Sequence, residues 1–367
     1  MPPRRPPGAR PKIGDVAARA RVSPGTVSNV LTGRRRVDPA LAERVRAAVE
    51  ALGYVPHAAA SQLRSNRTTV IGVVVPDLPN TFCATFVGKV EELARAEGYR
   101  TLVAGSGEDA DEELAQVQAL SAWRPAGVLI IPTDDRFRAR EILASAGVPV
   151  VAVDRVTDQM AVDSVGIDNA AEAGRAAAHL LALGHRRVLV IASTLGLSNI
   201  RDRVAGVRVA LAGRAAVEVV EGGPHVPAIA EAVGRRLERR PVPTAMLALT
   251  NKATLGAVVA LERAGLSVPR DVSLIGFDDN EWMKAMHPAI SAVRQPVEGL
   301  ARRAWEQLKA RLRGDRARPA SARLGCSLEL RDSTARPEGA GRPGAARPAR
   351  RRRAGPRSPL PASPRRA

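Results

Sequence analysis

The sequence predicts a small all-α domain followed by a larger α/β body of two doubly wound parallel-sheet lobes. The 367 residues are too many for one ordinary core, since domains usually contain roughly 100 to 200 residues. Residues 12–52 show only short helical patterns, whereas from residue 69 onward apolar runs alternate with helical stretches. This alternation continues for roughly 265 residues, which is too long for one small sheet.

The N-terminal part contains an extension and then short helices. Residues 1–11 are mostly Pro and Arg without periodicity, which is typical of a disordered extension. Ile13–Ala20 is expected to form the first helix, because its apolar residues recur at i, i+3, i+4 and i+7. A later helix is expected from Pro39 to about Leu52, with Asp38 before it as N-cap.

A second helix is expected between these two, from Pro24 to about Leu31. Ser23 is a good N-cap and Pro24 suits the first helical position. The apolar side chains of this helix point inward. The residues expected to face outward are Gly25, Thr26, Ser28 and Asn29.

The first two helices and the short turn at residues 21–23 have the pattern of a helix-turn-helix. The second helix of such a unit can lie in the major groove of DNA, where base edges present a distinguishing pattern of donors and acceptors. Exposed hydroxyls, the Asn29 side chain and the amides at the helix N-terminus are suited to phosphates and bases. The alternative is an ordinary helical hairpin.

The net charge of +19 is concentrated at the two ends of the chain. Residues 1–66 contain 12 basic and four acidic residues, and residues 337–367 contain nine and one. Residues 67–336 contain 35 basic and 32 acidic residues. Both ends therefore suit a polyanion, whereas the near-neutral middle suits a ligand-binding body. The Pro- and Arg-rich tail, 337–367, is expected to be disordered, and it either adds nonspecific DNA affinity or is only a solvated appendage.

The body is expected to contain eight strands with helices in most of the gaps. Continuous β-branched runs separated by helices favour parallel sheets that are buried on both faces. The break between the two lobes is expected near Asp168, where Asp168-Asn169 resembles an N-cap pair with an architectural role. The expected strands are Val70–Val75, Arg100–Ala104, Gly127–Ile131, Val148–Val153, Val188–Ala192, Val217–Val220, Ala245–Leu249 and Val272–Gly276.

Several function classes lack their sequence signals. The apolar run Val70–Val75 is too short to span a membrane and the N-terminus has no secretion signal, so a cytoplasmic protein is expected. Cys83 and Cys326 have neither a disulfide framework nor metal-ligand spacing. His185 lies at a helix-to-strand junction, where a structural role is favoured over catalysis. No hydrolase elbow, phosphate-binding loop or zinc-protease signature is present, so no cofactor, metal or catalytic residue is expected.

The order of short matches along the chain resembles the LacI/GalR family of bacterial repressors. The N-terminal stretch IGDVAARARVSPGTVSNVLTGRRRVDPALAERVRAAVEALGYVPHAAASQLR is similar to the headpiece and hinge of that family. The similarity continues through VIGVVVPDLPNTF, AGVLIIP, VDR, VGIDN, HLLALGHRRVLVI, RVAG, PTAMLAL, GLSVPRDVSLIGFDD and VRQP to LELRDST. It covers residues 12–334 and implies a body with two lobes of the periplasmic-binding-protein type.

The resemblance implies a headpiece at residues 12–57, a hinge helix at 58–68 and a two-lobed body at 69–336. In the family the hinge helix forms on operator DNA and a leucine enters the minor groove, and Leu63 occupies that place. Ala59 belongs to the same helix, and Arg64 is placed to meet phosphates. The alternative is that Leu63 only packs within a helix.

The two family positions that read bases fall on Pro24 and Gly25. Neither side chain forms hydrogen bonds, so few direct contacts with bases are expected at these positions. Asn29 is therefore the best candidate for a base contact. The other DNA-binding candidates are Ser23, Thr26 and Ser28.

The resemblance also implies an effector site between the lobes, at the carboxyl ends of strands. Arg203 and Asp278 have the best case, since Arg offers a planar fork to hydroxyls or a carboxylate and Asp pairs with vicinal hydroxyls. The alternative for these two is a structural ion pair, and Trp282 either stacks on the ligand or only packs. The remaining candidates are Phe82, Asp154, Thr250 and Asn251.

The resemblance implies a homodimeric repressor of double-stranded operator DNA, controlled by a small molecule such as a sugar or sugar acid. The effector, the sign of its control, the operator and the target genes remain open, as do dimer versus tetramer and the role of the tail. The rivals are a sugar-binding transport receptor, an enzyme and a nonspecific nucleoid protein. A receptor would need a signal peptide and no headpiece, and a nucleoid protein would bind DNA without preference for sequence.

Overall fold

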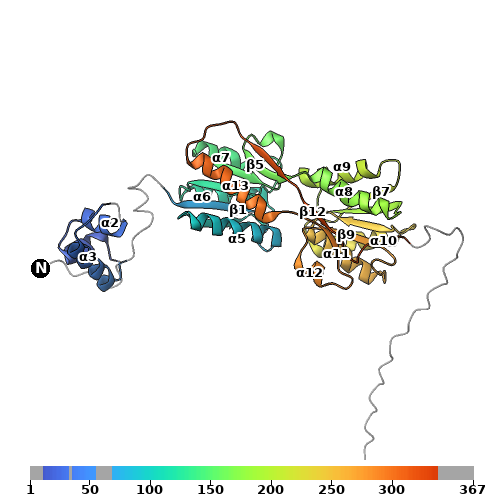
Figure 1. The fold of residues 1–367 in the computed structure, drawn as a ribbon, viewed down its shortest axis with the longest axis horizontal. Helices are drawn as coiled ribbons and strands as arrows, with labels where there is room; N and C mark the ends of the chain where they lie inside the picture. Colours follow the sequence, from blue (N-terminus) through green and yellow to red (C-terminus); the bar gives the residue numbers. More distant parts are fainter. Residues whose placement is uncertain (1–10, 33–34, 55–67, 338–367) are drawn as a thin grey trace, which may run out of the picture. The chain divides into compact units, whose positions relative to one another are not determined.

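The computed structural model describes residues 11–32, 35–54 and 68–337 (Figure 1). The three helices of the N-terminal headpiece come first. The body then divides into two compact units, residues 68–165 with 297–322 and residues 166–296 with 323–337. The proposed hinge residues Ala59, Leu63 and Arg64 lie outside the described residues, as do the first ten residues and the end of the tail.

The headpiece consists of α1 (Ile13–Ala20), α2 (Pro24–Thr32) and α3 (Pro39–Leu52), which confirms the three expected helices. The Asp38 carboxylate accepts hydrogen bonds from the backbone amides of Ala40 and Leu41, at 3.0 and 3.2 Å, and so caps α3. Gly53 ends α3 in the left-handed conformation. The helices share one small core of buried residues, namely Val16, Ala17, Ala20, Val27, Val45 and Ala48.

The first unit of the body contains a six-stranded sheet in the order β11-β5-β4-β3-β1-β2. The pairs from β2 through β5 are parallel, and every residue of β1, β3 and β5 is buried. The strands are β1 (Val70–Val75), β2 (Arg100–Gly105), β3 (Gly127–Ile130), β4 (Val150–Val153), β5 (Asp163–Ile167) and β11 (Ser321–Leu324). The helices of this unit are α5 (Thr81–Ala96), α6 (Ala110–Ser121), α7 (Ala139–Ser145) and α13 (Val297–Leu312).

The second unit contains a six-stranded sheet in the order β12-β10-β9-β8-β6-β7. Its pairs are parallel except for the antiparallel edge pair of β10 with β12. The strands are β6 (Arg187–Ala192), β7 (Ala216–Glu221), β8 (Ala245–Ala248), β9 (Ser273–Phe277), β10 (Ser291–Arg294) and β12 (Ser327–Glu329). The helices are α8 (Asn169–Ala182), α9 (Ser198–Leu211), α10 (Val226–Leu237), α11 (Asn251–Arg263) and α12 (Glu281–Ala285).

All eight expected strands are present within one or two residues, but β5, β10, β11 and β12 were missed. Three of these have few apolar residues, since β5 reads DSVGI, β11 reads SARL and β12 reads SLE. β10 has only four residues. The expected single break between the lobes was incomplete. The first boundary follows Val165, close to the expected position, but the units are also divided after Pro296 and after Ala322.

No helix within the described ranges is long and apolar enough to cross a membrane. Those ranges also contain no group of three His, Cys, Asp or Glu side chains that would suit a metal ion.

Candidate nucleic-acid interface and ligand site

The start of α2 is fixed by two hydroxyl side chains. The Ser23 Oγ accepts a hydrogen bond from the Thr26 amide at 3.0 Å and lies 2.9 Å from the Thr26 hydroxyl. Both hydroxyls therefore serve the helix N-terminus, as the sequence predicts for Ser23. The next two residues, Pro24 and Gly25, are exposed.

No neighbouring atom in the headpiece requires a glycine at residue 25, one of the two positions that the sequence resemblance assigns to base reading. A Cβ atom added there would meet only the Ser23 Oγ, at the ordinary contact distance of 3.6 Å. Asn29 is half-buried on the same helix, and its side chain makes no hydrogen bond with the described residues. The side-chain amide of Asn29 is thus available, and Gly25 leaves open space at the start of α2.

The turn between α1 and α2 depends on a residue that the sequence did not single out. The Arg44 guanidinium, from α3, donates to the carbonyl of Ala20 at 2.5 Å and to that of Arg21 at 3.4 Å. Arg21 has a φ of 51°, in the left-handed region. Arg44 thereby satisfies carbonyls at the end of α1 and fixes the turn that orients α2.

In the first unit, Phe82 and Asp154 both follow the carboxyl ends of strands. Phe82 lies in the first turn of α5, where Asn80 accepts its amide at 3.0 Å, and its ring is buried. Asp154 follows β4 with a φ of 64°, and its side chain is 8% exposed. Burial raises the pKa of the neighbouring Cys83 thiol to about 12, so this cysteine is an uncharged wall and not a nucleophile.

An ion pair next to Asp154 was missed by sequence reasoning. Arg155 donates two hydrogen bonds to the Glu108 carboxylate, at 2.6 and 2.7 Å. It also reaches the carbonyl of Thr133, whose hydroxyl lies 2.6 Å from that of Ser106. These residues follow β2, β3 and β4, so this pair links three loops at one edge of the sheet. Arg155 lies in the VDR segment that resembles the family, but no sequence pattern links it to Glu108.

In the second unit, Arg203 is the organising residue. It lies on α9, is 2% exposed, and donates from Nε to the Asn169 side chain at 2.8 Å and from Nη1 to the Leu249 carbonyl at 2.6 Å. Its guanidinium lies 3.8 Å from the centroid of the Phe277 ring. The remaining nitrogen, Nη2, makes no hydrogen bond to the described residues.

Arg203 brings the other expected residues of this unit together. Leu249 directly precedes Thr250 and Asn251, and Phe277 directly precedes Asp278. The Thr250 hydroxyl accepts the Ala253 amide at 3.0 Å and caps α11, so Thr250 has a structural role. Asn251 is 7% exposed at the first position of that helix.

Asp278 and Arg203 do not form an ion pair in the described structure. Asp278 follows β9 with a φ of 70°, and its Oδ1 accepts a hydrogen bond from Gln295 at 2.7 Å. The next residue, Asp279, contacts Arg331 at 2.6 Å instead. Trp282 packs on the apolar core of this unit, which favours its packing role.

Two further polar residues near these positions were missed. Asn169 was interpreted as part of an N-cap pair, and Asp168 does accept the Ala171 amide at 2.9 Å. Asn169 itself holds Arg203, however, and is buried. Asn199 lies one turn before Arg203 on α9 and is 5% exposed, and its Oδ1 has no hydrogen-bond partner among the described residues. Neither of these two asparagines has a distinct sequence signal.

Comparisons with known proteins agree with this architecture. Residues 12–57 match the model of bacterial regulatory proteins of the lacI family, and residues 177–334 match that of a periplasmic binding protein-like domain. The chain is 30% identical over 327 residues to catabolite control protein A of Priestia megaterium, which covers 88% of this chain and 98% of that protein. The chain belongs to the lacI family of bacterial regulatory proteins.

Solved structures of the same family give the same result. The lac repressor dimer bound to operator and the anti-inducer ONPF matches with a TM-score of 0.78 and 27% identity, covering 89% of this chain and all of that chain. The transcriptional regulator CelR in complex with cellobiose matches with a TM-score of 0.67 and 29% identity, covering 88% and 100%. This lacI-family member is a DNA-binding transcriptional regulator with a ligand-binding body.

Proposed function

We propose that this lacI-family member is a homodimeric repressor that binds a near-palindromic operator and is released or recruited by a sugar or sugar derivative. The similar lac repressor is a dimer on its operator, and the similar CelR binds cellobiose. Two headpieces related by a two-fold axis would read two half-sites. A regulator of transcription acts on the chromosome, which supports a cytoplasmic location and a binding function instead of an enzymatic one.

The observation that carries the effector proposal is the environment of Arg203. A buried guanidinium is costly unless its nitrogens find acceptors, and two of the three are already engaged by Asn169 and Leu249. Nη2 is therefore offered to a ligand oxygen, from either a hydroxyl or a carboxylate. The Asp278 carboxylate, which is fixed by Gln295, adds an acceptor for hydroxyl groups.

The remaining effector candidates have narrower roles in this proposal. In the first unit, Phe82 is a candidate apolar contact and Asp154 a candidate carboxylate, and in the second unit Asn251 is a candidate amide. Thr250 acts by holding the start of α11 and not by direct contact. In the headpiece, Asn29 reads a base, and Ser28 together with the backbone amide of Gly25 at the start of α2 faces phosphates.

Thermal unfolding tests the effector proposal. Purified chain is screened against neutral sugars and sugar acids, since a ligand that binds only the folded state raises the melting temperature. At 100 times its Kd, an effector should raise the melting temperature by roughly 5 to 10 °C. The Arg203→Lys variant should lose most of this shift, whereas Arg208→Lys, an exposed control on the same helix, should keep it. An equal shift in both variants would remove Arg203 from the site.

A further inference from the structure

The two edges of the parallel sheet in the first unit carry opposite charge. The loops that follow β1 to β4, residues 76–80, 106–109, 131–138 and 154–157, contain six acidic and three basic residues. The opposite edge is formed by the starts of β1 to β5 and the loop that follows α13. It contains five exposed arginines, which we name the basic edge: Arg100, Arg124, Arg313, Arg316 and Arg318.

Backbone pairing places the first two of these arginines at the start of β1. Arg100 is the register partner of Val70, the first residue of β1. Arg124 lies in the turn before β3, where the amide of Ala126 donates to the Val70 carbonyl at 2.7 Å. Arg100 and Arg124 therefore lie at the starts of the two strands that flank β1, at the end where the chain enters the body.

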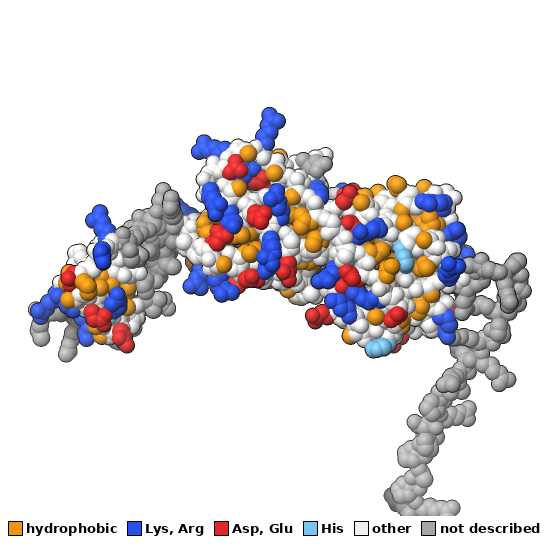
Figure 2. Space-filling view, in the orientation of Figure 1, with side chains coloured by type: hydrophobic (Ala, Val, Ile, Leu, Met, Phe, Trp, Pro, Cys, Tyr) orange, Lys and Arg blue, Asp and Glu red, His pale blue; other side chains and the backbone are white. Residues whose placement is uncertain are grey.

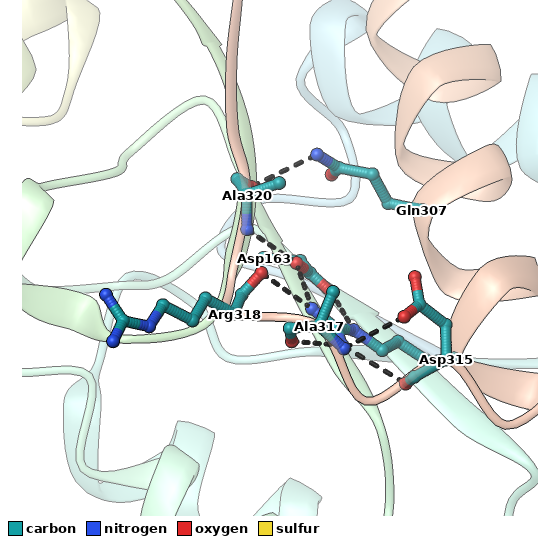
Figure 3. A network of polar contacts seen from close by, with 7 residues as sticks. Asp163, Gln307, Asp315, Ala317, Arg318 and Ala320 are labelled. Atoms are coloured by element: carbon teal, nitrogen blue, oxygen red, sulfur yellow. Dashed lines mark hydrogen bonds and ion pairs between the residues drawn. The ribbon is translucent and has the colours of Figure 1, made fainter.

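The other three arginines lie in the loop 313–320, which is fixed to the same edge (Figure 3). Asp163, the first residue of β5, accepts two hydrogen bonds from Arg311 at 2.6 and 2.8 Å and one from the Ala320 amide at 2.8 Å. Lys309 contacts Glu97 at 2.6 Å, three residues before Arg100. The Asp163 and Glu97 carboxylates are thus paired with α13, and the other acids in the segments that lead into this edge are Asp158 and Asp315.

The five side chains of the basic edge are not held by neighbouring groups of the described structure, although the charge of Arg313 acts on Glu97. All are exposed, and none makes a side-chain hydrogen bond or ion pair with the described residues. Elsewhere in the unit, exposed arginines such as Arg95 and Arg138 are paired with carboxylates at 3.0 and 2.6 Å. Lys and Arg side chains stand at several places on the visible surface of this unit (Figure 2).

The chain tethers the basic edge to the DNA-reading headpiece. Only residues 55–67 separate Tyr54, after α3, from Thr68, before β1. A fully extended segment of this length spans at most roughly 50 Å, or about 15 base pairs of duplex. When the headpiece is on its operator, the start of β1 therefore lies no farther than this distance from the end of the headpiece.

We propose that the basic edge binds DNA phosphates in addition to those bound by the headpiece, so that the body itself contributes to operator affinity. This inference rests on the proposed operator binding. Arginine forks suit phosphate oxygens, and each neutralised phosphate adds about 0.9 to the slope of log K against log salt. The contact carries no base sequence, so it strengthens binding to operator and other DNA alike.

The test is a fluorescence titration between about 50 and 200 mM salt. The probe is a duplex that the full-length chain selects from a random-sequence pool, alongside a scrambled duplex of equal length. The variant Arg313→Gln/Arg316→Gln/Arg318→Gln is compared with Arg208→Gln/Arg239→Gln/Arg240→Gln, which removes the same charge from exposed positions of the second unit. The basic-edge variant should flatten the salt slope by about 2 to 3 for each bound protomer on both duplexes and weaken binding roughly ten-fold or more.

The outcomes separate the inference from its basis. An unchanged salt slope in the basic-edge variant, or an equal change of slope in the control variant, overturns the DNA contact. The slope would stay unchanged if the basic edge bound a partner other than DNA. Arg316→Gln alone should flatten the slope by about 0.9 for each bound protomer, which keeps the test valid if the triple variant melts early. A wild-type chain with no preference for the selected duplex would contradict the proposed function, while the slopes on scrambled DNA would still decide the basic edge.

Discussion

At the scale of single residues, α2 has no hydrogen-bonding side chain at its first two positions. It has one side-chain amide, that of Asn29, which makes no hydrogen bond with the described residues. Gly25 and Pro24 offer no hydrogen-bonding side chain at the exposed start of α2, and the Ser23 and Thr26 hydroxyls are used for capping. Asn29 remains, with a side chain that can contact an adenine edge through two hydrogen bonds. Under the proposed function, Asn29 is therefore the side chain of this helix that is best suited to read a base.

Asn29→Ala should lower affinity for the selected operator about 10- to 100-fold and affinity for scrambled DNA less than about three-fold. A bidentate base contact discriminates by about 1 to 3 kcal/mol, whereas a phosphate contact acts on all sequences alike. Competition titrations of the two duplexes measure both effects. Equal losses on both duplexes would make Asn29 a phosphate contact.

The candidate site was predictable where a residue type has a chemical signature. Arg203 and Asp278 are charged residues within apolar surroundings; Asp278 directly follows β9, and Arg203 is buried on α9. Glu108 and Gln295 were not predictable, because their partners Arg155 and Asp278 are 47 and 17 residues away. Such pairs depend on which strands become neighbours, and strand order is not encoded locally.

At the scale of elements, α8 and α9 pack closely because each has a glycine at the contact. A Cβ atom on Gly206 would lie 1.9 Å from the Ala170 carbonyl oxygen, which is backbone and has little freedom to move. A Cβ atom on Gly174 would lie 3.2 Å from the Gly206 carbonyl oxygen. Gly206 is therefore required by close approach, and it stands three residues after Arg203 on α9.

Gly206→Ala should lower the free energy of unfolding by about 1 to 3 kcal/mol, because the two helices must separate to admit the methyl group. Gly234→Ala, within α10, is the matched control, since a Cβ atom there meets nothing within 4 Å. The control should be neutral or stabilise by up to about 1 kcal/mol. Urea unfolding of both variants measures the difference, and similar values would show that α8 and α9 separate freely.

A second feature at this scale is the contact between the His185 ring and the backbone of Ala335, which lies after the last strand. This buried ring lies 3.1 Å from both the Thr244 and Ser273 hydroxyls, and its Nε2 lies 3.0 Å from the Ala335 carbonyl oxygen. Burial lowers the pKa of His185 below its usual value of 6.5. The structural role expected from the sequence is consistent with these contacts, and the ring fixes residue 335 to the second sheet.

The lowered pKa makes stability depend on pH. The unfolded chain takes up a proton at His185 near pH 6.5, whereas the folded chain resists protonation until lower pH, so the free energy of unfolding falls as pH drops below about 6.5. His185→Gln should show a shallower fall between about pH 7.5 and 5.5, and His225→Gln, at an exposed position, should keep the wild-type slope. Unfolding midpoints in urea measure these slopes; parallel curves for all three proteins would exclude His185 as the cause.

Secondary structure was largely predictable because most elements have strong local signals. Asp38 with Pro39 marked the start of α3, and the β-branched run VIGVVV marked β1. β11 and β12 were not predictable, since they are short edge strands whose polar residues become paired only after the sheets have formed.

At the scale of the whole molecule, the chain passes from one body unit to the other three times, after Val165, Pro296 and Ala322. Neither unit is therefore a continuous segment. The sequence pattern predicted two doubly wound sheets but only one boundary, because helix α13 has the same local signals whichever sheet it covers. Effector binding in such a body can change operator affinity by the usual 5- to 150-fold of allosteric coupling.

The most direct test of this account is selection of binding sites by the full-length chain from a random-sequence pool, followed by titration of the selected duplex with and without the best effector from the thermal screen. The account predicts a near-palindromic site bound at least about 1,000-fold more tightly than scrambled DNA, with an affinity that changes five-fold or more when effector is present. Recovery of no shared sequence, or an affinity that no stabilising ligand changes, would contradict it.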